Sequence, residues 1–139
     1  MATRSSSPAS KLLARYPDAV QALAADAARL IRRLLPGVGE GADLSSGMLS
    51  YGFGPGYKGM VCTLILSQSG VKIGLVRGSE LDDPHGLLGG RGKVHRHIEL
   101  KAAADLRRPG VGDLIAASYA AWRARAATPA ARRVRAAAP

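Results

Sequence analysis

Two apolar segments separated by a short polar turn constrain the fold of this chain most strongly. Residues 60–66 read MVCTLIL, which is apolar on both sides of a strand and typical of a central position in a sheet. Residues 71–76 read VKIGLV, where apolar residues recur at every second position, and the SQSG between the two segments is typical of a turn. The pattern predicts an antiparallel hairpin over residues 60–77, with Arg77 on the inward side.

Amphipathic helices are predicted on both sides of these strands. From Pro17 to Leu34 apolar residues recur at steps of three and four, and the proline and glycine that follow end the helix. A second helix is expected over residues 111–125, with one apolar stripe made of Leu114, Ile115, Tyr119 and Trp122. Further strands are expected near residues 48–53 and over residues 94–100. This order predicts an α+β fold, a two-layer sandwich whose N- and C-terminal helices pack on one face of an antiparallel sheet.

The charge of the chain is concentrated at its two ends. The net charge is +10, but eight of the twenty basic residues lie before Tyr16 or after Trp122, so twelve basic and ten acidic residues leave only +2 between them. We therefore expect a single domain over residues 16–125, a flexible tail at 1–15 and a basic Ala/Arg/Pro tail at 126–139. Nucleic-acid binding is expected only weakly, through these tails.

Cysteine usage and hydropathy predict a cytoplasmic protein without a membrane segment or cofactor. Cys62 is the one cysteine, so it has no partner for an internal disulfide, and its apolar surroundings favour a core position. The first residues lack the apolar core of a signal peptide, and no apolar run reaches the roughly 20 residues that span a bilayer. Nothing in the sequence specifies an oligomeric state.

The segment from Leu81 to Leu100, LDDPHGLLGGRGKVHRHIEL, combines a turn, a glycine-rich loop and clustered cations. Glycines expose backbone N–H groups that capture anions, and cations beside them add charge, so this segment predicts a site for a small anionic ligand. It is not a P-loop, because no Ser or Thr follows Lys93 and a strand follows where a helix is required. The predicted ligand-binding residues are Gly90, Gly92, Lys93, Arg96 and His97, with Tyr57, Lys58 and Arg77 lining the same pocket.

A structural interpretation of the same segment stays open. The glycines would then only shape the connection into the last strand, and Arg96 would pair with Asp82, Asp83 or Glu99.

Metal binding and catalysis have little support. His95 and His97 are two apart on the expected last strand, which places both side chains on one face about 7 Å apart, but no third ligand is evident. We therefore expect no metal site. The residues that come nearest to being candidate metal ligands are His95, His97, Asp18 and Asp26. No nucleophile elbow, Cys–His pair or carboxylate dyad is present, so we do not expect an enzyme.

The run DPHGLLGGRGKVHRHIEL, together with YPDAVQALAADAARLIRRLLP, GMLSYGF and YKGMVCTLIL, resembles the YdhG-like family, a bacterial domain of unknown function. The resemblance covers about residues 16–121. It implies a compact α/β sandwich similar in outline to frataxin, and one member of the family is described as a frataxin-like iron chaperone. Many members carry a Trp before Gly-Met and a Pro after it, where this chain has Ser46 and Leu49.

Iron chaperoning of that kind uses carboxylates on the first helix and first strand, because hard cations prefer oxygen ligands. This chain offers Asp18 and Asp26, followed by Glu40 and Asp43. The expected function is a non-catalytic binding or accessory module that uses residues 86–97 to recognise a small anionic ligand or an acidic protein segment. The alternatives are a frataxin-like iron chaperone and weak nonspecific nucleic-acid binding.

Overall fold

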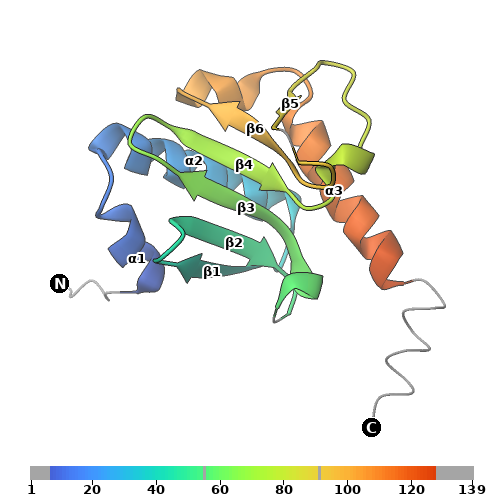
Figure 1. Cartoon of the computed structure of the whole chain (residues 1–139), viewed down its shortest axis with the longest axis horizontal. Helices are drawn as coiled ribbons and strands as arrows, with labels where there is room; N and C mark the ends of the chain where they lie inside the picture. Colours follow the sequence, from blue (N-terminus) through green and yellow to red (C-terminus); the bar gives the residue numbers. More distant parts are fainter. Residues whose placement is uncertain (1–6, 55, 91, 128–139) are drawn as a thin grey trace, which may run out of the picture.

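A six-stranded antiparallel sheet forms the centre of the protein, in the order β1-β2-β3-β4-β6-β5. The structure is a computed structural model that describes residues 7–54, 56–90 and 92–127. Figure 1 shows helices α2 and α3 on one face of the sheet, so the predicted α+β class is confirmed. The elements are α1 (Pro8–Leu13), α2 (Asp18–Leu34), β1 (Gly39–Asp43), β2 (Met48–Gly52), η1 (Tyr57–Gly59), β3 (Met60–Leu66), β4 (Val71–Leu75), η2 (Gly78–Glu80), β5 (Leu88–Gly89), β6 (Arg96–Leu100), η3 (Ala103–Arg107) and α3 (Val111–Ala126).

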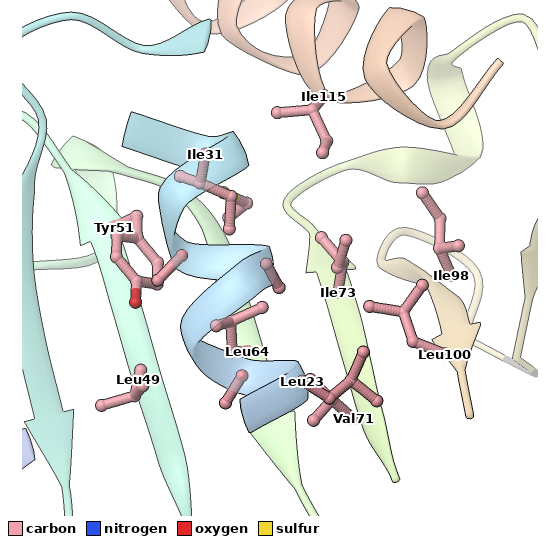
Figure 2. Packing of buried hydrophobic residues seen from close by; sticks show 14 of the residues in the cluster. Leu23, Ile31, Leu49, Tyr51, Leu64, Val71, Ile73, Ile98, Leu100 and Ile115 are labelled. Atoms are coloured by element: carbon pink, nitrogen blue, oxygen red, sulfur yellow. The ribbon is translucent and has the colours of Figure 1, made fainter. Parts of the chain in front are cut away.

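The core lies between the helices and one face of the sheet. Figure 2 shows Leu23 and Ile31 of α2 and Ile115 of α3 pointing toward strand residues such as Leu64 and Ile73. These five side chains are 0 to 5% exposed. Cys62 is buried in the same layer, which confirms its predicted core position, and burial raises the pKa of its thiol to about 12.

The predicted hairpin is confirmed, but it ends two residues earlier than expected. β3 and β4 pair in antiparallel register, with Leu64 opposite Ile73, and β4 ends at Leu75. Arg77 adopts a left-handed backbone conformation with φ 57° and its side chain is 45% exposed. The prediction that Arg77 faces inward is therefore wrong, because the chain turns out of the sheet before it.

Strand β1 is an element that the sequence pattern did not predict. It reads GEGAD, is mostly exposed, and forms the edge of the sheet beside β2. Tyr51 of β2 is fully buried, and its hydroxyl donates a 2.5 Å hydrogen bond to Glu40 of β1, which also accepts from Arg32 of α2. Burial and the neighbouring Glu40 raise the pKa of Tyr51.

The domain was predicted to begin at Tyr16, but the ordered structure begins earlier in the chain. In the described part of the predicted N-terminal tail, residues 8–13 form α1, capped by the Ser7 side chain, which accepts a hydrogen bond from the Ser10 N–H. Leu12 of this helix is completely buried in the core, so these residues cannot be called a flexible tail. Residues 1–6 and 128–139, which include most of the predicted basic tails, lie outside the described residues.

The last strand is shorter than the predicted range 94–100. β6 begins at Arg96, so His95 lies before it and the assumption that His95 and His97 share a strand is wrong. The end of α3 at Ala126 agrees with the predicted helix over residues 111–125. Among the described helices, none combines the length and the apolar character that crossing a bilayer requires.

Candidate functional site

A turn held by Asp83 leads the chain into the glycine-rich loop of the Leu81–Leu100 segment, called the glycine segment below. The Asp83 carboxylate accepts hydrogen bonds from the backbone N–H groups of Leu87 at 2.8 Å and Leu88 at 2.9 Å. Gly86 adopts φ +65°, and its N–H donates to the Asp83 carbonyl. The turn residues Asp83, Pro84 and Gly86 therefore set the path into β5.

Arg96 links the glycine segment to the last strand. Its Nη1 donates a 2.8 Å hydrogen bond to the carbonyl of Gly90, a residue with φ +107°. A Cβ on Gly90 would lie 3.0 Å from Nδ1 of His97, so a side chain has little room there. Within the described residues Arg96 forms none of its three predicted ion pairs. These contacts support the interpretation in which the glycines shape the connection into the last strand.

His95 joins three separate segments of the chain. Its Nδ1 accepts a 3.0 Å hydrogen bond from the backbone N–H of Arg77, and its Nε2 lies 3.3 Å from the Tyr57 hydroxyl. Because Nδ1 is an acceptor, the neutral ring carries its proton on Nε2 and can donate it to Tyr57. The two rings meet edge to face, with centroids 5.9 Å apart.

A pocket of about 370 Å³ lies next to this contact, on the sheet face that points away from the core and its helices. Gly74 pairs with Thr63 on one side and with His97 on the other, so these three residues form a row across the open face. The pocket is lined by Met48, Tyr57, Met60, Thr63, Ile65, Gly74, Leu75, Val76, His95, Arg96 and His97. It therefore combines an apolar floor with three consecutive basic residues of the Leu81–Leu100 segment.

The structure brings together some of the predicted site residues. Tyr57, Arg96 and His97 line this pocket, and Gly90 lies against His97. Gly90 itself does not line it, and neither do the other four predicted residues. Arg77 pairs with Glu80, the Lys58 carbonyl accepts from Trp122 Nε1, and Gly92 and Lys93 are exposed in the loop.

The sequence reasoning missed the floor of the pocket. Met48, Met60, Thr63, Ile65 and Gly74 come from three strands, and none was named as a site residue. The available signal was the outward side of the hairpin, because Ile65 and Gly74 share the parity that points away from the core.

The electrostatic environment of His97 disfavours its charged form. Burial and the nearby cation of Lys72 hold the pKa of His97 below its ordinary value, and the opposing effect of Glu99 is smaller. His97 also borders a second hollow of about 360 Å³, whose lining includes Lys101, Asp105 and Arg108.

The polar groups of this second hollow already hold the backbone. Asp105 accepts from the N–H groups of Lys101 and Ala102, and Arg108 donates to the Glu99 carbonyl. These contacts fix the connection from β6 to η3, so we assign this hollow a structural role.

The metal candidates are not assembled into one site. Asp18 begins α2 and Asp26 pairs with Arg29 on the same helix, whereas His97 lies on β6 and His95 lies in the loop before it. Among the described residues no group of three or more His, Cys, Asp or Glu side chains is placed to hold a metal ion.

No family model, curated protein or solved structure matches the chain. The fold and the pocket define an α+β protein with a pocket on the sheet face that points away from α2 and α3, and the YdhG-like assignment stays a prediction from the sequence motif.

Proposed function

We propose that this protein is a non-catalytic binding module whose open sheet face takes a small ligand with an anionic group. The observation that carries the proposal is the 370 Å³ pocket whose lining residues include His95, Arg96 and His97 beside apolar residues of three strands. Its volume falls within the range of about 300–1,000 Å³ typical of ligand pockets, which combine apolar walls with a few polar groups.

The composition of the pocket supports an anion over a cation. Among the described residues, its lining includes one arginine and two histidines and no aspartate or glutamate. A guanidinium carries five N–H donors, and the hydrogen bond to Gly90 accounts for one of them. The glycine segment contributes by holding this basic end of the pocket in place rather than by wrapping the ligand.

Thermal unfolding with a panel of carboxylates, inorganic phosphate and nucleotides tests the proposal. A ligand that binds only the folded state raises the melting temperature in a concentration-dependent way. We expect at least one class of anion to do so, and calorimetry to give an affinity that falls about tenfold in Arg96→Gln.

Arg33→Gln is the matched control, because Arg33 is an exposed arginine of α2, on the other side of the sheet. His97→Gln is a second variant that leaves the link between Arg96 and Gly90 intact. The proposal is wrong if no anion on the panel binds, or if Arg96→Gln and His97→Gln bind as tightly as Arg33→Gln.

A further inference from the structure

The floor of the pocket is largely apolar and comes from neighbouring strands. Met48 and Ile65 are a cross-strand pair on the open face, Met60 lies at the start of β3, and all three are only partly buried. Gly74 contributes no side chain at the centre of the floor. Glycine within a strand often marks a place where another molecule approaches the backbone closely.

We propose that the pocket binds an aromatic carboxylate, with its ring lying over Gly74 and its charged group at the His95–His97 end. This inference rests on the proposed function, because it names the class of anion that the same pocket takes.

The shape of the floor favours a flat ligand. A Cβ on Gly74 would lie 2.4 Å from Thr63 Oγ1 and 3.4 Å from Ile65 Cδ1. The Thr63 hydroxyl and the Ile65 methyl therefore occupy the space directly beside Gly74, and a planar ring lying across these groups fits better than a branched aliphatic group that needs depth.

The chemistry of the walls favours an aromatic ring. Methionine sulfur is polarisable and makes favourable contacts with the edges of aromatic rings, and two methionines line this pocket. On another side stand Tyr57, which is 57% exposed, and His95, in edge-to-face contact with it. Aromatic pairs in offset or edge-to-face geometry add stabilisation beyond the burial of area, so a bound ring would extend this contact.

The basic end of the pocket favours a carboxylate. Arg96 and the two histidines line the pocket together, and the cation of Lys72 acts on His97 from β4. A planar carboxylate matches the fork of N–H donors on a guanidinium, and a His97 N–H can donate to the same oxygens, whereas both nitrogens of the His95 ring already contact Arg77 and Tyr57.

Nuclear magnetic resonance of isotope-labelled methionine methyl groups tests this inference directly. The chain contains three methionines, of which Met48 and Met60 line the pocket and Met1 begins the chain. During a titration with benzoate we expect saturable ring-current shifts of the Met48 and Met60 methyl signals, while the Met1 signal stays in place. Cyclohexanecarboxylate has the same charge without the aromatic ring, and benzyl alcohol has the ring without the charge. We expect each to bind about tenfold more weakly than benzoate.

A methyl group placed on the floor provides a second test. Gly74→Ala alone strains the sheet against Thr63, so it is combined with Thr63→Ala, and Thr63→Ala alone is the control. We expect the double variant to lose benzoate binding about tenfold relative to that control, with both variants folded by their melting temperatures.

The outcomes separate the two proposals. If cyclohexanecarboxylate or phosphate binds in this pocket as tightly as benzoate, the aromatic inference is wrong and the anion-binding function stands. If benzoate binds but the Met48 and Met60 signals do not move, the assigned pocket is wrong. If no anion binds, both proposals fall.

Discussion

The guanidinium of Arg96 holds the carbonyl of Gly90 at 2.8 Å, and this contact ties β6 to the glycine segment that precedes it. On the other side of β5, Asp83 holds the N–H groups of Leu87 and Leu88. Two side chains therefore fix the path of a segment whose glycines would otherwise leave it free to take many conformations. The position of His95 and His97 beside the pocket depends on this path.

Replacing Asp83 with Ala is expected to lower the free energy of unfolding by about 2 kcal/mol, because two backbone N–H groups lose a charged acceptor. Denaturant unfolding measures the change. The neighbouring Asp82 is exposed, and Asp82→Ala is expected to change stability by about 0.5 kcal/mol or less. Equal effects of the two variants would show that the Asp83 turn does not hold the segment.

Replacing Leu12 with Ala is expected to lower the free energy of unfolding by about 2–5 kcal/mol, because the side chain is completely buried. Leu13, which is only partly buried, is the matched control, and its replacement with Ala should cost clearly less. A negligible effect of Leu12→Ala would mean that α1 is not part of the folded domain.

The thiol of Cys62 is expected to resist alkylation in the folded protein. Burial raises its pKa to about 12, so almost none of it is the reactive thiolate at neutral pH, and the side chain has no solvent contact. Labelling should proceed only through unfolding and should accelerate with denaturant. Fast labelling under native conditions would contradict the buried position in β3.

The His97 imidazole is expected to make the folded state less stable in mild acid. Its pKa is held below the ordinary value of 6.5, so the unfolded chain takes up the proton first as the pH falls. The stability that the neutral His97 imidazole contributes at neutral pH is therefore lost as the pH falls from 6.5 to the lower pKa that His97 has in the folded state. His97→Gln should flatten the dependence of stability on pH in this window, and an unchanged slope would contradict the assignment.

Anion binding should reverse this effect at the same residue. A bound carboxylate favours the charged imidazole, so benzoate affinity is expected to rise as the pH falls toward the pKa of His97. Calorimetry at several pH values measures the change, and proton uptake on binding should disappear in His97→Gln. An affinity that falls with pH in the range where benzoate stays ionised would contradict a role for His97.

The elements that could be predicted from the sequence are those that bury one face in the core, because burial of one face gives their apolar residues a regular spacing. The hairpin of β3 and β4 and the helices α2 and α3 show regular apolar spacing because each places one face against the core. The edge strand β1 has no such pattern, since GEGAD pairs on one side and is largely exposed. Helix α1 was also missed as part of the domain, because one buried leucine in a short helix leaves no periodic signal.

The candidate site was predicted in part for a related reason. The Leu81–Leu100 segment carries local turn chemistry, so the roles of Asp83 and Gly86 follow from residues close together in the chain. The floor of the pocket depends on which strands are neighbours, and Met48 meets Ile65 only through the pairing of β2 with β3. Long-range pairing of this kind has no local sequence signal.

Backbone amide signals recorded during a benzoate titration show most directly whether this sheet face binds an organic anion. We expect the largest shifts on Thr63, Gly74, His95 and His97, and we expect these shifts to saturate together and to be lost in Arg96→Gln. Shifts confined to α2 or α3, or no shifts at all with any carboxylate tested, would contradict binding at this face.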